Sequence, residues 1–328
     1  MSEPAIVVER LGRTFTDRGR GIVALRDVSF QVGAGEIVGL LGSNGAGKTT
    51  LTKILATLLL PTTGTARLFG HDVTRDLRAV RRMTGVVLGG DRGFYAKLGA
   101  RDNLRFFAVL AGVGRRGLDA KLDAALEQVG LSGAADRAVE TYSKGMRQRL
   151  HIAIGMIAEP RVLLLDEPTV GLDPVEAERL RGTVAALRDT GVSVLLTSHH
   201  LLDIERLASR VIILADGTLA ADLPVDEFAR QAGYTATVIV RGTGAPPDAV
   251  ALALASSDIA VGGVDTADGA WTLRLHVRDW NVGSFGLLEK ALAHVSVLDV
   301  RIEPVRLEDV YSHVAARLAA GSRVGGAR

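Results

Sequence analysis

A glycine-rich run between an apolar stretch and a helical pattern carries the clearest chemical signal in this sequence. It reads Gly-Ser-Asn-Gly-Ala-Gly-Lys-Thr-Thr and fits the pattern G-x-x-x-x-G-K-[ST]. Glycines let the backbone curl until successive N–H groups point at phosphate oxygens, and the following helix adds positive charge at its N-terminus. An ordinary glycine-rich turn is the competing interpretation, which the flanking strand and helix disfavour. The predicted phosphate-binding residues are Gly42, Ser43, Asn44, Gly45, Ala46, Gly47, Lys48, Thr49 and Thr50.

Two acidic residues follow a second apolar stretch. Residues 162–165 are Val-Leu-Leu-Leu, and Asp166 and Glu167 come directly after them. Carboxylates at the end of a buried strand are costly unless they bind something. With a nucleotide in the loop, Lys48 would reach the β- and γ-phosphates, and Thr49 and Asp166 would hold Mg²⁺. Glu167 would then act as the general base toward water, although a solvated acidic turn is the alternative for this pair taken alone.

A polar segment ahead of the acidic pair supplies a family resemblance. It reads Tyr-Ser-Lys-Gly-Met-Arg-Gln-Arg-Leu over residues 142–150. Together with the phosphate loop and the acidic pair, it resembles the signature of ABC transporter ATP-binding subunits, whose usual form is LSGGQ. The resemblance implies that Ser143, Lys144, Gly145 and Met146 face the γ-phosphate of an ATP held by the opposite subunit of a dimer. Lys144 and Met146 depart from the commonest form, and an N-capped basic helix is the alternative for the segment alone.

Four further positions agree with this resemblance. Asp173 ends a Val-Gly-Leu-Asp run that follows the acidic pair, as the family's dimer-contacting loop does. His199 matches the histidine that senses the γ-phosphate and positions the catalytic carboxylate. His200 is the neighbouring candidate, but the following Leu-x-Asp-x-Glu run favours His199, and a lone histidine after a strand is usually structural. Phe15 occupies the place of an aromatic ring that stacks on adenine, with a core aromatic as the alternative.

One family residue is missing. The family carries a glutamine that touches Mg²⁺ and the attacking water and couples hydrolysis to the membrane subunit. Here Gly89 or Gly90 takes its place, depending on register, and Asp91 follows. Asp91 could substitute through a water, although its side chain is shorter and charged. This departure concerns coupling rather than nucleotide binding.

Composition restricts the partners and the chemistry. The 328 residues carry 39 Lys and Arg against 37 Asp and Glu, and no clustered basic patch suggests nucleic acid as a partner. The absence of cysteine excludes disulfides, thiolate metal sites and cysteine nucleophiles. Uncharged apolar runs stay shorter than the roughly 18 residues of a spanning helix. Neither a signal peptide nor a membrane span is expected, so the chain should stay in the cytoplasm. Together with this expectation, the family resemblance implies a peripheral protein on the cytoplasmic face of the cell membrane.

The motifs must be positioned by strands that alternate with helices. Strands are expected at 36–41, 162–165 and 193–197, each just ahead of a motif, and helices at 48–60, 174–190 and 201–208. This alternation implies parallel βαβ units. We therefore predict an α/β fold, a P-loop NTPase core over residues 1–232, with an inserted α-helical subdomain at about 91–158.

The pattern changes after residue 232. Strands at 235–240, 259–264, 271–277 and 297–302 and helices at 248–255 and 282–294 give the order βαββαβ of a ferredoxin-like module. This small α+β accessory domain is expected over 233–318, with a last helix at 307–318 and a disordered tail at 319–328. The run Val-Arg-Leu-Glu-Asp-Val-Tyr at 305–311 resembles the end of the domain appended to ABC-2-type exporter subunits of the daunorubicin-resistance kind.

The resemblance implies a specific activity and set of partners. The chain is expected to bind ATP and Mg²⁺, to hydrolyse ATP as a homodimer or heterodimer of nucleotide-binding subunits, and to drive export through a separate transmembrane permease of ABC-2 type. The alternatives are an ATP-binding regulatory protein and a soluble ABC ATPase with weak turnover. A single cassette without a heptad run disfavours a ribosome- or DNA-directed ATPase.

Overall fold

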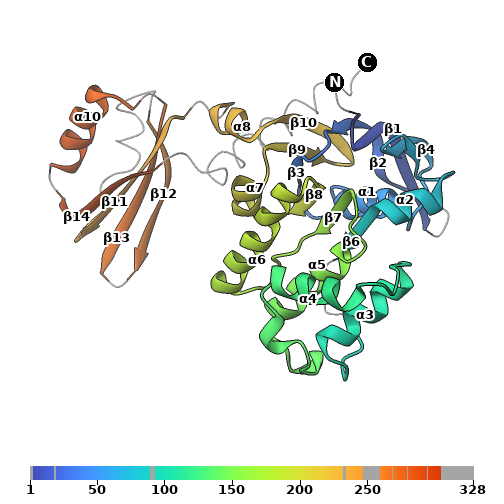
Figure 1. Ribbon diagram of the computed structural model, residues 1–328. Coiled ribbons are helices and arrows are strands. Elements are labelled where there is room, and N and C mark those ends of the chain that lie inside the picture. The colour runs from blue at the N-terminus through green and yellow to red at the C-terminus, as the bar shows by residue number, and fades with distance from the viewer. Residues whose placement is uncertain are drawn as a thin grey trace, which may run out of the picture. The chain divides into compact units, whose positions relative to one another are not determined.

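The computed structural model describes residues 3–17, 20–88, 93–231, 234–246, 259–267, 269–278, 280–293 and 295–303 (Figure 1). The chain divides into two compact units, Met1–Leu223 and Pro224–Arg328. This division falls nine residues ahead of the boundary predicted after residue 232. Each unit has its own apolar cluster.

A six-stranded sheet forms the centre of the first unit. Its strand order is β10-β9-β3-β8-β7-β6, and the pairs from β9 to β6 are parallel. Every residue of β3, β7 and β8 is buried. Since neighbouring side chains in a strand point to opposite faces, both faces of these strands are covered, which explains why β7 and β8 are apolar apart from the polar residues at their ends. The strands are β3 (Ile37–Leu41), β6 (Thr84–Val87), β7 (Val162–Asp166), β8 (Ser193–Ser198), β9 (Arg210–Ala215) and β10 (Thr218–Pro224).

A second, four-stranded sheet packs beside the first around a shared core. Its order is β2-β1-β4-β5, all antiparallel. Apolar residues of β1, β2 and β4 form one buried cluster with residues of the first helix and of the central sheet. The strands are β1 (Ile6–Asp17), β2 (Arg20–Val32), β4 (Thr63–Leu68) and β5 (His71–Asp72).

The helix after the phosphate loop is shorter than predicted. Helix α1 spans Lys48–Leu55, whereas the sequence favoured a helix to residue 60. Thr57 adopts a left-handed conformation (φ 60°), and the N–H of Leu58 bonds back to the carbonyl of Lys53. Such a turn satisfies late helical carbonyls and ends the helix. The helix therefore ends five residues ahead of its predicted end at residue 60.

Helices make up most of the described segment between β6 and β7, the region where the sequence predicts a helical subdomain. The buried Asn103 side chain fastens α3 to the preceding loop, because its amide bonds the backbone of Tyr95, Leu98 and Gly99. Within the described ranges, no helix has both the length and the apolar character needed to cross a membrane. The helices of this unit after α1 are α2 (Leu77–Met83), α3 (Ala100–Leu110), α4 (Leu118–Gln128), α5 (Lys144–Met156), α6 (Pro174–Ala186) and α7 (Leu201–Leu207), with 3₁₀ turns at Ser132–Ala134, Val139–Thr141 and Leu187–Thr190.

The second unit contains a four-stranded antiparallel sheet in the order β12-β13-β11-β14. Trp271, Leu273, Leu275 and Val277 line one face of β13 and pack with Leu288 of α10. The alternation predicted for this strand thus marks its buried face. The elements are α8 (Val225–Gln231), β11 (Ala236–Thr243), β12 (Ile259–Ala267), β13 (Ala270–Val277), α10 (Val282–Leu292) and β14 (Ser296–Glu303).

Several predictions lie outside the described residues. They are the helix at 248–255, the closing helix at 307–318, the tail at 319–328 and the loop Gly89–Gly90–Asp91.

The division into two units predicts that the first folds without the second. A chain ending at Gln231 keeps β10 and the whole apolar cluster of the first unit. We expect this truncated chain to give a cooperative unfolding transition by circular dichroism and to bind ATP by calorimetry with an affinity within about threefold of the full chain, because both sheets and the phosphate loop are retained. An unfolded product, or one unable to bind ATP, would show that the two units form one cooperative core.

Candidate functional site

The phosphate loop connects β3 to α1 and is shaped by glycine. Gly45 and Gly47 have φ angles of 85° and 103°, which side-chain-bearing residues rarely adopt. A Cβ on Gly47 would lie 2.5 Å from the carbonyl oxygen of Ala24, and one on Gly42 would lie 2.6 Å from that of Leu214. The loop therefore curls against β2 and β9 in a way that only glycine permits. It borders a cavity of about 160 Å³ that is lined by Ala24, Asn44, Gly45, Ala46, Gly47, Lys48, Thr49, Thr50 and Glu167.

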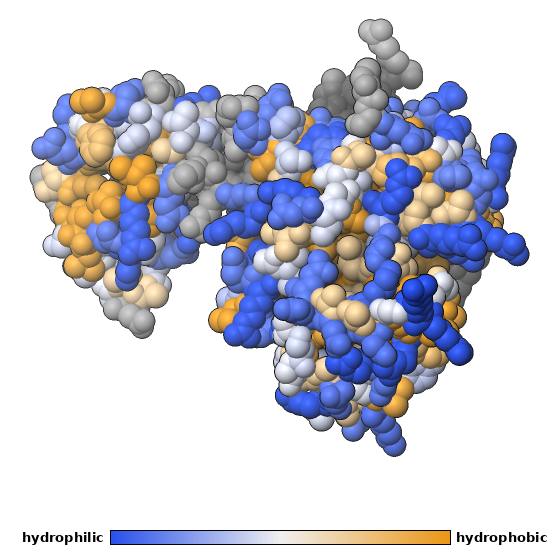
Figure 2. Space-filling model, viewed as in Figure 1, coloured by the Kyte–Doolittle hydropathy of each residue, from blue (hydrophilic) through white to orange (hydrophobic). Residues whose placement is uncertain are grey.

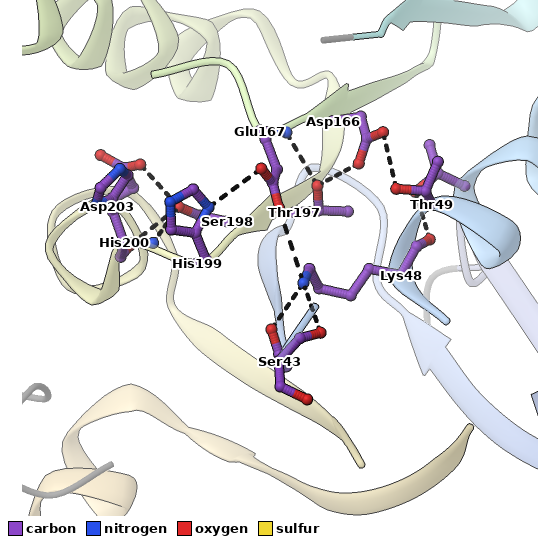
Figure 3. A network of polar contacts seen from close by, with 12 residues as sticks. Ser43, Lys48, Thr49, Asp166, Glu167, Thr197, Ser198, His199, His200 and Asp203 are labelled. Atoms are coloured by element: carbon purple, nitrogen blue, oxygen red, sulfur yellow. Dashed lines mark hydrogen bonds and ion pairs between the residues drawn. The ribbon is translucent and has the colours of Figure 1, made fainter. Parts of the chain in front are cut away.

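Lys48 places a buried positive charge in this cavity. Its side chain is 5% exposed, and Nζ donates to the carbonyl oxygens of Gly42 (2.7 Å) and Ser43 (3.2 Å). The same Nζ lies 3.8 Å from Oε1 of Glu167 (Figure 3). The ammonium group is thus held by its own loop and faces Glu167, the acidic residue directly after β7.

Asp166 joins three segments of the site (Figure 3). Its carboxylate accepts a hydrogen bond from the Thr197 hydroxyl (2.6 Å) and one from the Thr49 hydroxyl (3.2 Å). Thr197 lies opposite Asp166 on the neighbouring strand β8, and Thr49 is in the first turn of α1. A carboxylate and a hydroxyl at this distance are hard oxygen ligands of the kind that Mg²⁺ prefers.

Glu167 is held in an unusual backbone conformation. Its φ is 49°, in the left-handed region. Its N–H donates to both the carbonyl and the hydroxyl of Thr197, each at 3.0 Å. Oε2 lies 3.1 Å from Nδ1 of His199, whereas the ring of His200 stacks beside that of His199. Of the two histidines considered from the sequence, His199 is therefore the one that contacts Glu167.

The signature segment begins a different helix. Ser143 caps α5, because its hydroxyl accepts a hydrogen bond from the N–H of Met146 at 3.2 Å. Gly145 is buried against α6, where a Cβ would lie 2.2 Å from Oε2 of Glu176. None of the four signature residues is among those lining the cavity beside the phosphate loop in the described part of the chain.

Asp173 and Phe15 have local contacts of their own. Asp173 is the N-cap of α6, and its side chain accepts bonds from the N–H groups of Val175 and Glu176, each at 3.0 Å. Phe15 lies on β1 opposite Ile22, and the Arg13 guanidinium lies 4.6 Å from the centre of its ring. Phe15 is not among the described residues that line the phosphate-loop cavity. Its contact with adenine therefore stays a prediction.

The sequence analysis assigned no role to three polar side chains that hold this site together. Thr197, Ser198 and Asp203 are all buried, at 0%, 1% and 0% exposure. Thr197 bonds Asp166, and Ser198 bonds Asp203 at 2.9 Å. The available signal was the hydroxyl pair that ends an otherwise apolar strand, since buried polar groups require partners.

Comparison with known proteins places the chain in a family. Residues 25–170 match the sequence model of the ABC transporter family. The doxorubicin resistance ATP-binding protein DrrA of Mycobacterium tuberculosis is 40% identical over 253 residues, covering 77% of this chain and 75% of that protein. The daunorubicin resistance ATP-binding protein DrrA3 of Streptomyces coeruleorubidus is 35% identical over 317 residues and 96% of both chains.

Solved structures show the same fold. The ATP-binding subunit of an ABC transporter is similar with a TM-score of 0.61 and 29% identity, covering 70% of this chain and 93% of that one. The dimeric cassette MJ0796, bound to ADP and Pi in a post-hydrolysis state, has a TM-score of 0.62 at 23% identity over 67% of this chain and 98% of that one. The expected P-loop NTPase core is thereby confirmed, and the chain belongs to the ABC transporter family as an ATP-binding, ATP-hydrolysing subunit.

Proposed function

We propose that Glu167 is the general base of ATP hydrolysis and that His199 positions it. The observation that carries this proposal is the placement of the Glu167 carboxylate, 3.1 Å from His199 Nδ1 and 3.8 Å from Lys48 Nζ. Glu167 removes a proton from the water that attacks the γ-phosphorus, and the bond from the γ-phosphorus to the bridging oxygen breaks to release ADP. Lys48 and the N–H groups of the phosphate loop stabilise charge on the phosphate oxygens.

Mg²⁺ fits the same site. Thr49 and Asp166 would hold it, since their oxygens already lie 3.2 Å apart. Among the described residues no group of three or more His, Cys, Asp or Glu side chains could hold a metal. A nucleotide-associated Mg²⁺ takes few protein ligands and fills its coordination with phosphate oxygens and water. The ion would neutralise phosphate charge.

The working form is proposed to be a head-to-tail dimer of nucleotide-binding subunits, either of this chain or with a paralogue. Ser143, Lys144, Gly145 and Met146 would face the ATP of the partner subunit, and Asp173 would lie at the interface. Two observations support this: the signature residues do not line the cavity of their own phosphate loop, and the similar cassette MJ0796 is dimeric. Phe15 is proposed to stack on the adenine.

Transport is proposed to be export through a separate ABC-2-type permease, with this subunit bound peripherally at the cytoplasmic face of the membrane. Relatives named for doxorubicin and daunorubicin resistance support export as the direction of transport. Helix α3 offers an apolar surface for a membrane subunit, because Phe106, Val109 and Leu110 are exposed at 41%, 55% and 71%. Nucleic acid is not proposed as a partner.

The second unit is proposed to be a ferredoxin-like accessory domain over 233–318. The antiparallel order β12-β13-β11-β14 supports this, because it is the strand order that a βαββαβ chain gives in that fold. Figure 2 shows hydrophobic residues gathered on this unit in the region of β14 and α10. Exposed apolar residues there support a role in dimer contact or permease docking; they are Val282, Phe285, Val297, Leu298, Val300 and Ile302.

Removing the Lys48 charge tests nucleotide binding. Lys48→Ala should abolish high-affinity ATP binding measured by calorimetry with Mg²⁺ present, because charge-assisted bonds to the phosphates are about twice as strong as neutral ones. Lys53→Ala is the matched control: it lies on the same helix and is exposed, so it should bind ATP as the unchanged chain does. Retention of ATP affinity by Lys48→Ala would contradict the assignment of this loop.

Glu167→Gln tests the catalytic base. The amide keeps the shape and loses the basicity, so ATP should still bind while phosphate release falls by about 10²- to 10⁴-fold, the usual range for a general base. The variant should also accumulate an ATP-dependent dimer in gel filtration. Glu205→Gln, at an exposed position of α7, should hydrolyse ATP normally. Unchanged turnover in Glu167→Gln would remove Glu167 from the mechanism.

A regulatory ATP-binding protein with weak turnover is the second candidate, and the glycines at 89 and 90 favour it. If the missing glutamine limits hydrolysis, Gly89→Gln or Gly90→Gln should raise steady-state phosphate release by the purified subunit. If Asp91 replaces it through a water, Asp91→Ala should collapse the rate and neither glutamine should help. Wild-type rates in all three variants would show that this loop does not limit turnover.

A further inference from the structure

A fully buried carboxylate lies outside the phosphate-loop cavity. Asp203, on α7, is 0% exposed, which makes it more buried than either Lys48 or Asp166. A carboxylate in such a position is costly unless its oxygens accept hydrogen bonds from several donors. The partners that the fold supplies to Asp203 therefore indicate what it does.

Its three side-chain partners come from three different segments. The Ser198 hydroxyl, at the end of β8, lies 2.9 Å away, and the Nε of Arg181, on α6, lies 2.8 Å away. The Thr169 hydroxyl, in the loop after β7, makes a short contact. Burial would lower the pKa of Arg181, but hydrogen bonds to Asp203 and Glu178 raise it above its ordinary value. One carboxylate thus ties α6 and the ends of two neighbouring strands.

The first connection holds the backbone on both sides of His199 (Figure 3). The N–H of His200 donates to the Ser198 hydroxyl at 2.9 Å, and the hydroxyl donates to Asp203. The N–H of Asp203 donates to the carbonyl of His200 at 3.1 Å. The His199 ring itself is 42% exposed. Its approach to Glu167 therefore depends on a backbone that Asp203 helps to hold.

The second connection holds the loop that leads from Glu167 to Asp173. Thr169 is 4% exposed, and its carbonyl accepts the N–H of Leu172 at 3.2 Å. Asp173 then caps α6, the helix from which Arg181 reaches Asp203. Asp203 therefore holds this loop at two places. It bonds Thr169 near the start of the loop, and it bonds Arg181 on α6, the helix that begins where the loop ends.

We propose that Asp203 is a positioning residue for ATP hydrolysis that holds His199 against Glu167 and ties this histidine to the loop ending at Asp173. The proposal rests on the roles proposed above for Glu167 and His199. Asp203 contacts neither the phosphate loop residue Lys48 nor Asp166 through any of these bonds, so it should affect the turnover of bound ATP and leave ATP binding intact.

Asp203→Asn is the direct test, because it keeps the shape and removes the charge and one acceptor. The expected result is a kcat lowered by about 10- to 100-fold, since small misplacement of a reacting group can cost that much. The KM for ATP and the calorimetric affinity should stay within about twofold. Glu178→Gln is the matched control, because it removes the exposed partner of Arg181 and leaves Asp203 untouched.

A double-mutant cycle separates positioning from a general structural defect. If Asp203 acts through His199, Asp203→Asn should lower single-turnover phosphate release by less than about twofold in a His199→Ala background. Ser198→Ala provides a second route if Asp203→Asn fails to fold. It cuts only the connection to the histidine, keeps the Asp203–Arg181 pair, and should lower kcat in the same direction without changing ATP affinity.

The outcomes distinguish this inference from the proposed catalytic site. Normal kcat in both Asp203→Asn and Ser198→Ala, with Glu167→Gln inactive, would overturn the role of Asp203 alone. A full, additive loss in the His199→Ala background, or a raised KM, would overturn it as well. Activity retained by Glu167→Gln would instead remove the catalytic site on which the inference rests.

Discussion

The Asp166 carboxylate, buried at the end of β7 and bonded by Thr197 and Thr49, is the contact on which the rest of the site depends. It links β7 to the neighbouring strand β8 and to the first turn of α1, the helix that follows β3 through the phosphate loop. Because parallel strands end at the same edge of a sheet, the loops after β3, β7 and β8 meet there. The phosphate loop, the acidic pair and His199 occupy these three loops, so the topology brings them together without any long side chain.

The side chains at this edge of the sheet become more exposed from Asp166 to His199. Asp166 and Lys48 are nearly enclosed, Glu167 is 27% exposed and His199 is 42% exposed. A left-handed conformation such as that of Glu167 costs on the order of 1–3 kcal/mol, and two hydrogen bonds from its N–H to Thr197 offset part of that cost. The strand end that fixes Asp166 therefore also turns the next carboxylate away from the core, toward the cavity and the histidine.

The sequence predicted those parts of the fold that local patterns encode. Apolar runs predicted the buried strands β3, β7 and β8, and the alternation of apolar and polar residues predicted β13 and its buried face. The helix α1 was predicted too long, because the left-handed Thr57 is not a residue that usually marks a helix end. Asp203 was given no role for a different reason. Its contribution depends on hydrogen bonds to β8, α6 and the loop after β7, and no short-range sequence pattern reveals partners from three segments.

Helix α6 contacts both the signature segment at the start of α5 and the segment that carries His199. Its cap, Asp173, ends the loop that begins at Glu167, and its Arg181 bonds the carboxylate of Asp203, which holds the backbone beside His199. Its Glu176 fills the space beside Gly145 at the start of α5. The Glu176 carboxylate also lies 3.3 Å from the guanidinium of Arg149, which is buried on α5. A side chain on residue 145 would collide with that carboxylate, so glycine is required here by packing within the subunit, whatever the segment contacts elsewhere. Helix α6 thereby connects the signature segment to the backbone beside His199 through two ion pairs of low exposure, Arg149–Glu176 and Arg181–Asp203, and it begins at Asp173, its exposed N-cap.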